Sequence, residues 1–365
     1  MAIKETTEMT IEQLGWSSAW EDRLKACDPD GLTPGRVVSV HRTECELLTE
    51  RGVERAALSG RLRMELDGQD ALAVGDWAGL RRAAPGGQPV IAAVLPRRGA
   101  LRRQAAGQRT AAQVVAANVD VALLVSGLDH DFNLRRIERY VAFAYAGGAA
   151  PVIVLNKADL CHDAQARLQD VEAVAPGTPA LLVCGASGAG VEALRELLPA
   201  GVTGVMLGSS GVGKSTLINR LLDSSRLRTG ATREQDSRGR HTTTRRELLL
   251  LPGGGLIIDT PGMRELQLWA DGAGALGSTF ADIEQFARSC RFRDCRHDRE
   301  PGCGVRTAIE EGRLASERLA SFHKLRREER RQETRQDQLA QASDKARLRR
   351  MHKAAREHMR RKRRF

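Results

Sequence analysis

A phosphate-binding loop lies in the second half of this 365-residue chain. Residues 208–216 read GSSGVGKST and fit the pattern G-x-x-x-x-G-K-[ST]. In this pattern the glycines let backbone N–H groups approach phosphate oxygens, and the lysine adds a mobile positive charge. An apolar run, Val205–Leu207, precedes the loop, and a helix-like stretch, Ser215–Leu222, follows it. The strand, loop and helix order predicts a nucleotide-binding α/β domain.

A second phosphate-side motif is Asp259-Thr-Pro-Gly262, which follows the apolar run 255–258 and fits D-x-x-G. We expect Lys214 to bridge the β- and γ-phosphates and Ser215 to bind Mg²⁺ directly. Asp259 would hold Mg²⁺ through water, and the Gly262 N–H would contact the γ-phosphate. The other loop residues expected at the nucleotide are Gly208, Ser209, Ser210, Gly211, Val212, Gly213 and Thr216.

The base is expected to be guanine, because Asn156-Lys157-Ala158-Asp159 follows the apolar strand pattern 151–155. The Asp159 carboxylate can accept hydrogen bonds from N1–H and the 2-amino group of guanine, a donor pair that adenine lacks. Asn156 would brace the neighbouring loops, and the stem of Lys157 can lie along the purine.

A further base-side loop follows the apolar run 180–183. Cys184 and Gly185 stand where a Ser-Ala pair usually presents a backbone N–H to guanine O6. Because the contact is made by backbone, we include both residues in the predicted site.

The guanine motif precedes the phosphate loop, whereas most GTPases have the opposite order. In an open parallel sheet the binding loops gather at the carboxyl ends of the strands, so the site depends on where loops lie and not on chain order. The order therefore predicts a circularly permuted domain. It also makes the 259–262 motif lead directly into the C-terminal region.

Two catalytic assignments directly follow the polar, Gly- and Arg-rich segment 223–239. Thr243 is favoured over Thr242 as the residue that senses Mg²⁺ and the γ-phosphate together. Met263 follows the D-x-x-G glycine and cannot orient the attacking water. His241 is the nearest titratable candidate, the alternative being a histidine with no chemical role.

Short β-rich segments precede this domain, at residues 35–41, 71–74, 77–80 and 89–95. Their spacing predicts a small five-stranded barrel, for which an oligonucleotide-binding (OB) barrel is one candidate. A basic face on the barrel could come from Arg61, Arg63, Arg81 and Arg82.

Four metal-ligand residues follow the nucleotide domain with the spacing Cys290-x4-Cys295-x-His297-x5-Cys303. Zn²⁺ takes such sets tetrahedrally, so we predict a zinc site. The alternative is a set of unligated thiols on a loop.

Net charge is concentrated at one end of the chain. Residues 323–365 hold 17 Lys and Arg against 6 Asp and Glu, which accounts for the whole net charge of +11. Such a tail binds polyanions with little sequence preference, unless it is only a solvated charged segment. No apolar run predicts a signal or a membrane span, and seven cysteines, an odd number, fit a reducing compartment, so we expect a cytoplasmic protein without a membrane partner.

Together these motifs, with Gln113–Asp120 and the sequence GRHTTT at 239–244, resemble the circularly permuted, ribosome small-subunit-dependent GTPase A (RsgA) family of bacteria. The resemblance covers roughly residues 35–320. It implies an OB-type barrel, a permuted α/β GTPase domain and a mostly α zinc-binding domain with a basic tail. The expected boundaries are 1–34 for an N-terminal extension, 35–105, 106–272, 273–322 and 323–365.

The resemblance also implies a function. The expected activity is hydrolysis of GTP to GDP and phosphate, stimulated by the 30S subunit during its late maturation. The expected binding partner is 16S rRNA, and the expected cofactors are Mg²⁺ and one Zn²⁺. We expect the protein to be a monomer. The resemblance also supports the four zinc ligands and implies that His241 orients the attacking water. Two other hypotheses are a non-catalytic RNA-binding protein with a structural nucleotide site and an ATP-driven nucleic-acid enzyme.

Overall fold

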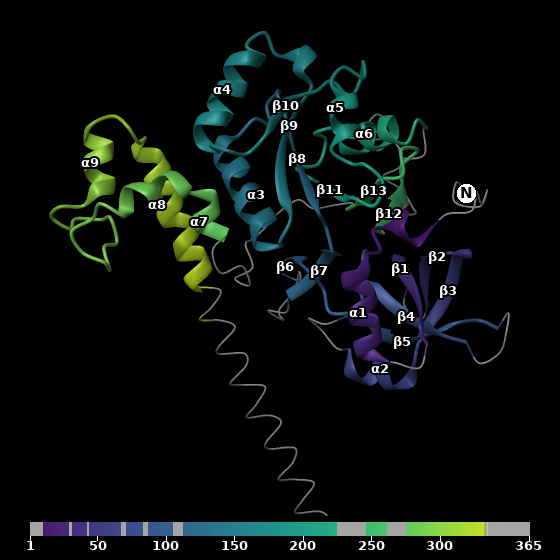
Figure 1. Cartoon of the computed structure of the whole chain (residues 1–365). Coiled ribbons are helices and arrows are strands. Elements are labelled where there is room, and N and C mark those ends of the chain that lie inside the picture. The colour runs from purple at the N-terminus through teal and green to yellow at the C-terminus, as the bar shows by residue number, and fades with distance from the viewer. Residues whose placement is uncertain are drawn as a thin grey trace, which may run out of the picture.

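Three structural units follow one another along the chain: a closed five-stranded barrel, a six-stranded mixed sheet flanked by helices, and a group of C-terminal helices (Figure 1). The computed structural model describes residues 10–28, 31–41, 44–66, 71–82, 87–104, 112–224, 246–260, 275–331 and 334. No helix in these ranges is both long and apolar enough to cross a membrane.

The barrel has the strand order β1-β2-β3-β5-β4, in which β3 and β5 are parallel and the other neighbours antiparallel. This is the five-stranded topology expected of an OB-type barrel. Its interior is filled by apolar side chains such as Val37, Leu47 and Ile91. The strands are β1 (Thr33–Val40), β2 (Cys45–Thr49), β3 (Gly52–Leu58), β4 (Trp77–Arg81) and β5 (Val90–Val94), and helix α2 (Gly60–Glu65) follows β3.

The sequence pattern predicted the barrel but not all of its strands. Strands β2 and β3 were missed, and the predicted strand at 71–74 is wrong. The backbone N–H of Ala73 is hydrogen-bonded to the carboxylate of Asp76 instead of to a neighbouring strand. The chain then turns at Gly75, whose φ is +91°. An apolar run alone therefore did not distinguish a buried turn from a strand.

An N-terminal segment and a buried arginine join the barrel to the central unit. Arg36 of β1 is 1% exposed and donates to the Leu14 carbonyl, the Asn118 carbonyl and the Thr203 hydroxyl. Its guanidinium also lies 4.9 Å from the centre of the Trp77 ring. The short helix η1 (Ile11–Leu14) and helix α1 (Ser18–Cys27) are thereby tied to the barrel and the central sheet.

The central sheet has the order β10-β9-β8-β11-β13-β12, all parallel except β12. Its middle strands are continuous apolar runs because helices cover both faces, which is the pattern of an α/β fold. The bounds are β8 (Val121–Gly127), β9 (Ala150–Asn156), β10 (Ala180–Leu182), β11 (Thr203–Leu207), β12 (Glu247–Leu250) and β13 (Leu256–Asp259). The flanking helices are α3 (Leu134–Ala146), η3 (Ala158–Leu160), α4 (Ala164–Val174), α5 (Val191–Glu196) and α6 (Lys214–Leu221).

Two smaller elements complete the chain. An antiparallel pair, β6 (Ala100–Gln104) and β7 (Ala112–Ala117), connects the barrel to β8. The C-terminal helices α7 (Ala275–Thr279), α8 (Ala281–Ala287) and α9 (Gly304–Glu310) are followed by a helix over residues 316–331. In Figure 1 these helices lie beside α3, while the barrel lies near β12, so the two flanking units contact different parts of the central one.

Candidate nucleotide site and metal centre

Strand register brings the sequence motifs to one edge of the sheet. Strand β8 lies between β9, which ends in the guanine motif, and β11, which ends in the phosphate loop. In the two ladders Gly127 is paired with Asn156 and Leu124 with Leu207. Strand β13 ends at Asp259 beside β11. All three motifs therefore begin at the carboxyl ends of neighbouring parallel strands, where α/β folds bind ligands.

The side chain of Asn156 connects three of the loops. It is 2% exposed; its Nδ2 donates to the Val212 carbonyl at 2.8 Å, and its Oδ1 accepts from the Gly185 N–H at 2.9 Å. One amide group thus holds the phosphate loop and the base-side loop against the end of β9. This amide is positioned to brace both loops.

Two glycines of the phosphate loop have no room for a side chain. At Gly208 a Cβ would lie 2.3 Å from the Val125 carbonyl oxygen, and at Gly213 it would lie 2.3 Å from Asn156 Nδ2. Gly213 also has a φ of +96°, a conformation that other residues rarely adopt. Glycine at these two positions lets the loop pack closely against β8 and against the Asn156 side chain.

Lys214 begins helix α6 and folds back over the loop. Its ammonium group donates to the carbonyls of Gly208 and Ser209 at 2.7 and 2.6 Å. Ser215 and Thr216 follow it in the first turn of α6. On the neighbouring strand the Thr260 hydroxyl donates to the Met206 carbonyl at 2.9 Å, which fixes the start of the 259–262 motif against the strand that leads into the loop.

The predicted base-reading residues also lie together. The Cys184 thiol donates to Asp159 Oδ1 at 3.0 Å. Lys157 has a left-handed backbone, with φ +62°, and its ammonium group lies 2.6 Å from a carboxylate oxygen of Asp129. Burial raises the pKa of Asp129, but hydrogen bonds from Lys157 and from the Asp131 backbone outweigh it and leave the pKa below its usual range.

Three residues at this edge were missed by sequence reasoning. Asp129 lies two residues after β8, so its position at a strand end was the only available signal. Arg220 of α6 donates to the carbonyls of Gly185 and Ala186, which ties the base-side loop to the phosphate-loop helix. Tyr140 of α3 has a pKa raised by burial, with a hydrogen bond from Ser209 opposing the shift. Neither Arg220 nor Tyr140 belongs to a short motif.

Three predicted site residues, His241, Thr243 and Gly262, lie outside the described residues, as do Thr242 and Met263. Their roles stay predictions. The same holds for most of the basic tail, residues 335–365.

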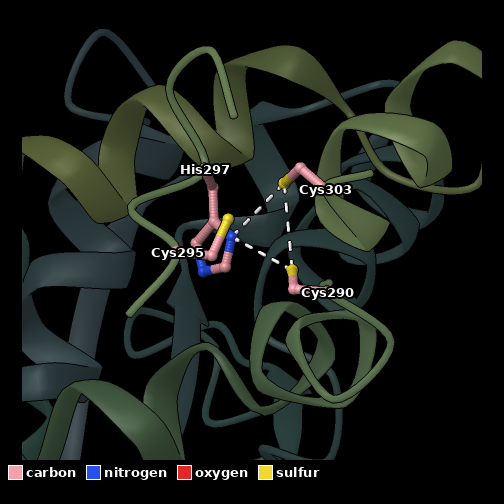
Figure 2. Close-up of side chains that lie close together, drawn as sticks. All are labelled: Cys290, Cys295, His297 and Cys303. Atoms are coloured by element: carbon pink, nitrogen blue, oxygen red, sulfur yellow. Dashed lines mark hydrogen bonds between the residues drawn. The ribbon is translucent and has the colours of Figure 1, made fainter. Parts of the chain in front are cut away.

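The cysteine and histidine residues predicted to bind metal form one cluster (Figure 2). Their ligand atoms all lie within 4.8 Å of one another. His297 Nδ1 is 3.6 Å from Cys290 Sγ and 3.4 Å from Cys303 Sγ, and those two sulfurs are 3.9 Å apart. Zn–S bonds of about 2.3 Å in a tetrahedron require sulfurs roughly 3.8 Å apart. The set therefore fits a metal such as zinc.

Thiols of this cluster must lose their protons to bind a metal, because the thiolate is the ligand. Burial and the neighbouring thiols raise the pKa of Cys295 to about 11, against a backbone hydrogen bond from His297 that lowers it. The loop between the ligands is fixed by Glu300, which accepts hydrogen bonds from the N–H groups of Arg296, Asp298 and Arg299. These backbone donors hold the pKa of Glu300 at about 2.

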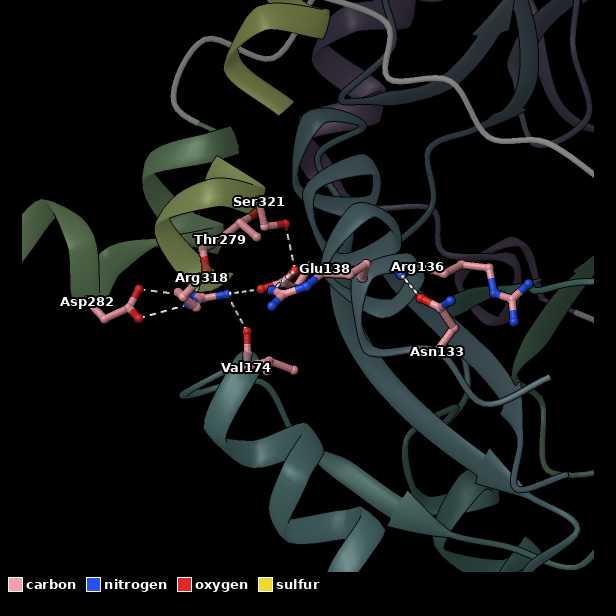
Figure 3. A network of polar contacts seen from close by, with 9 residues as sticks. Asn133, Arg136, Glu138, Val174, Thr279, Asp282, Arg318 and Ser321 are labelled. Carbon is pink, nitrogen blue, oxygen red and sulfur yellow. Dashed lines mark hydrogen bonds and ion pairs between the residues drawn. The ribbon is translucent and has the colours of Figure 1, made fainter. Parts of the chain in front are cut away.

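A buried ion network attaches the C-terminal helices to α3 (Figure 3). Arg318 is 2% exposed and lies 2.8 Å from Glu138 of α3 and 2.8 Å from Asp282 of α8. It also donates to the carbonyls of Val174 and Thr279. Burial alone would lower the pKa of Arg318, but these two carboxylates reverse the shift and raise it. The guanidinium therefore stays charged.

The parallel sheet, the phosphate loop and a guanine motif that precedes it in sequence define a circularly permuted GTPase. A family model described as RsgA GTPase matches residues 94–269. The chain belongs to the RsgA family of GTPases.

Relatives and solved structures agree with this assignment. A protein of Opitutus terrae called small ribosomal subunit biogenesis GTPase RsgA is 47% identical, covering 88% of this chain and 90% of the relative. A protein of the same name from Streptomyces coelicolor is 43% identical, covering 91% of this chain and 90% of the relative. The crystal structure of YjeQ from Thermotoga maritima is similar with a TM-score of 0.61 and 28% identity, covering 81% of this chain and 98% of the other. The structure of YloQ, a circularly permuted GTPase, has a similar fold, with a TM-score of 0.59, 24% identity and coverage of 82% and 96%.

Proposed function

We propose that this GTPase hydrolyses GTP to GDP and phosphate in response to the 30S ribosomal subunit, and that it acts in the cytoplasm during late 30S maturation by binding 16S rRNA. The relatives that are named for small-subunit biogenesis support the partner. The observation that carries the nucleotide assignment is the pair of Asn156 hydrogen bonds that join the phosphate loop and the base-side loop.

In the proposed complex Lys214 exchanges its two loop carbonyls for β- and γ-phosphate oxygens, and the N–H groups of residues 208–216 contact the phosphates. Ser215 and Thr243 would bind Mg²⁺, with Asp259 holding it through water. When bound, the metal neutralises charge that develops on the phosphates. Asp159 selects guanine, and Cys184 supports that carboxylate by hydrogen bonding.

His241 is proposed to hold the attacking water, because Met263 cannot. A water hydrogen-bonded to a neutral imidazole is oriented toward the γ-phosphorus, and the bond from that phosphorus to the β–γ bridging oxygen breaks as the new one forms. Replacing His241 with alanine should lower kcat at least tenfold with little change in KM. An equal loss of GDP affinity would assign the residue to binding instead.

The central experiment is hydrolysis of GTP and of ATP by the full chain, with and without purified 30S subunits. We expect hydrolysis of GTP alone, and a rate that rises at least tenfold with subunits. Lys214→Ala should abolish turnover while leaving 30S binding intact. Turnover unchanged by Lys214→Ala would refute the site. Absence of any turnover in the unaltered chain, with normal 30S binding, would favour the non-catalytic alternative.

The four ligands Cys290, Cys295, His297 and Cys303 are proposed to hold one Zn²⁺ with a structural role. All four ligand positions come from the protein, which is the arrangement of a closed structural site and leaves no open position for a substrate. The metal would fix the loop 290–303 and the helices that follow it. Residues 323–365, together with the barrel and this domain, would then contact rRNA.

A further inference from the structure

A basic cavity lies between the metal-binding loop and the helix over residues 316–331. Its volume is about 370 Å³. Arginine is its dominant lining residue, with one acidic side chain and one histidine beside it. The lining residues are Arg296, Asp298, Ala320, His323, Arg326, Arg327 and Arg330.

The helix presents its positive charges to this cavity from one face. His323, Arg326, Arg327 and Arg330 follow the spacing i, i+3, i+4, i+7, which places side chains on the same side of a helix. An adjacent side of the helix is anchored in the core by Phe322 and Leu325, which are 4% and 2% exposed. The helix is therefore held in a fixed orientation with its basic face outward.

The loop side of the cavity is equally well held. Arg296 belongs to the segment whose N–H groups are bound by Glu300, and Arg306 donates to the Asp298 carbonyl at 2.9 Å. Because both walls are fixed by other contacts, the cavity exists before any ligand binds. A ligand then meets preorganised charges and pays less ordering entropy.

Three charges of the cavity wall have no ion-pair partner among the described residues. In the part of the chain that the structure describes, the guanidinium groups of Arg296, Arg326 and Arg330 form no ion pair; Arg326 only lies over the Phe322 ring. The barrel arginines differ: Arg61 is paired with Glu65, and Arg81 and Arg82 are paired with Asp28 and Glu54. Of the four arginines expected on that face of the barrel, Arg63 alone has no ion pair among the described residues, whereas three arginines of the cavity have none.

We propose that this cavity is a receptor for phosphodiester groups of single-stranded RNA. Guanidinium groups match phosphate oxygens in geometry and charge. Asp298 lines the same cavity, where it can accept a hydrogen bond from the ribose 2′-hydroxyl that lies beside each phosphodiester group of RNA. The inference rests on the proposed function, for which it names one site of rRNA contact.

An exposed aromatic ring on the same loop agrees with a single-stranded ligand. Phe292 is 42% exposed, and the guanidinium of Arg291 lies 5.6 Å from its ring centre. Proteins that bind single strands combine basic grooves with aromatic rings on which bases stack. A duplex would not offer its bases to such a ring.

The test is binding of a fluorescent 12-nucleotide oligouridine to the full chain, measured by anisotropy at several salt concentrations. Arg296→Glu with Arg330→Glu should weaken binding at least tenfold. Each phosphate contact to a single strand contributes about 0.7 to the slope of log K against log salt, so loss of two contacts should lower that slope by roughly 1.4.

The matched control is Arg293→Glu with Arg299→Glu. Both residues are exposed on the same loop and do not line the cavity, and the change in net charge is identical. We expect less than a threefold effect. Equal losses in the two double variants would show that only diffuse charge matters and would overturn the proposal, as would undiminished binding in the first variant.

Two further measurements separate the outcomes. Polyglutamate at the same charge concentration should compete poorly; competition equal to that of unlabelled RNA would identify an acidic protein ligand and reject the RNA receptor. Intrinsic GTP hydrolysis should be the same in both double variants and the unaltered chain, which shows that the nucleotide-binding unit is folded, and equal zinc content in all three shows that the metal-binding unit is intact. If 30S subunits fail to stimulate hydrolysis while the oligouridine result holds, the proposed function fails and the cavity assignment stands.

Discussion

At the scale of single residues, the candidate site depends on polar side chains that each connect more than one loop. Asn156 joins the phosphate loop to the base-side loop, and Arg220 holds the latter from the other side. Lys157 is fixed by Asp129. These contacts keep the loops in place at the sheet edge. Replacing one of these residues should therefore displace more than one loop of the site.

Replacing Asn156 with alanine should weaken GDP binding about 30-fold, because two buried hydrogen bonds of about 1 kcal/mol each are lost. Fluorescence of a labelled GDP measures the affinity. The control is Asn133→Ala, which removes the side-chain cap of α3 and should cost about 1 kcal/mol of stability with nearly unchanged GDP affinity. Similar affinities in both variants would show that Asn156 does not organise the site.

Replacing Asp159 with asparagine should reverse base selection. An amide can donate to the oxygen at position 2 of xanthine but cannot accept both guanine donors, so we expect the variant to prefer XTP over GTP by at least tenfold. Competition binding with the two nucleotides provides the measurement. A variant that still favours GTP would remove Asp159 from base recognition.

At the scale of elements, helix α3 connects the nucleotide edge to the C-terminal helices. Its first turn follows Asp129, which contacts the guanine motif, and its middle carries Glu138, which is fully buried. A carboxylate in a helix core is stable only with a charged partner, which Arg318 provides. A second contact, between Arg139 and Glu328, lies further along the same helix. The attachment of the two units is therefore ionic as well as apolar.

Arg318→Ala should lower the free energy of unfolding by about 3–5 kcal/mol, because it leaves Glu138 buried without a counter-charge. Urea denaturation followed by circular dichroism tests this. Arg313→Ala is the comparison, since Arg313 is half-exposed in its pair with Glu311 and should change stability by less than about 1 kcal/mol. Adding Glu138→Gln to Arg318→Ala should restore part of the loss; no recovery would argue against a charge effect.

The metal loop yields a second prediction at this scale. Cys290→Ser should reduce bound zinc from about one atom per chain to nearly none, measured by elemental analysis. The zinc affinity of the unaltered chain should fall as pH falls, because the metal competes with protons for the thiols. One of these is Cys295, whose pKa is raised to about 11 by burial. Zinc content independent of both changes would show that the metal lies elsewhere.

At the scale of the whole molecule, unpaired positive charge gathers in the C-terminal region. Ion pairs neutralise Arg61, Arg81 and Arg82 of the barrel, whereas the basic cavity and residues 335–365 hold excess charge. An RNA partner would thus be attracted to the C-terminal region, whose described helices are attached to α3. Helix α3 would then connect the nucleotide site to the region that contacts RNA.

Deleting residues 335–365 should weaken binding of the full-length protein to 30S subunits and flatten the salt dependence, since each lost phosphate contact lowers the slope by 0.7 or more. The cut leaves the helix over 316–331 intact, with its buried Leu325. Sedimentation with subunits at several salt concentrations measures the effect. An unchanged slope would exclude the tail from the interface, whereas loss of intrinsic GTP hydrolysis would indicate damage to the fold.

Much of the fold and of the candidate site could be predicted from short contiguous segments of the sequence. The phosphate loop, the motif at 156–159 and the cysteine and histidine spacing each place their chemistry within a few residues, so local order is enough to recognise them. The permuted α/β class followed from the order of the guanine motif and the phosphate loop, and the barrel followed from the spacing of short apolar runs. The pattern failed where an apolar run entered a turn at 71–74, because periodicity does not reveal which group a backbone N–H finds.

The long-range pairings were decided by tertiary structure. Arg36 reaches Thr203, Arg318 reaches Glu138, and the basic cavity combines a loop with a helix more than twenty residues away. None of these partners is marked by spacing or composition. A charged side chain has many possible partners along a chain. Only the packing of helices and strands around a dry core determines which opposite charge lies near enough to stabilise it. The same packing determines which charges remain unpaired and available to a ligand.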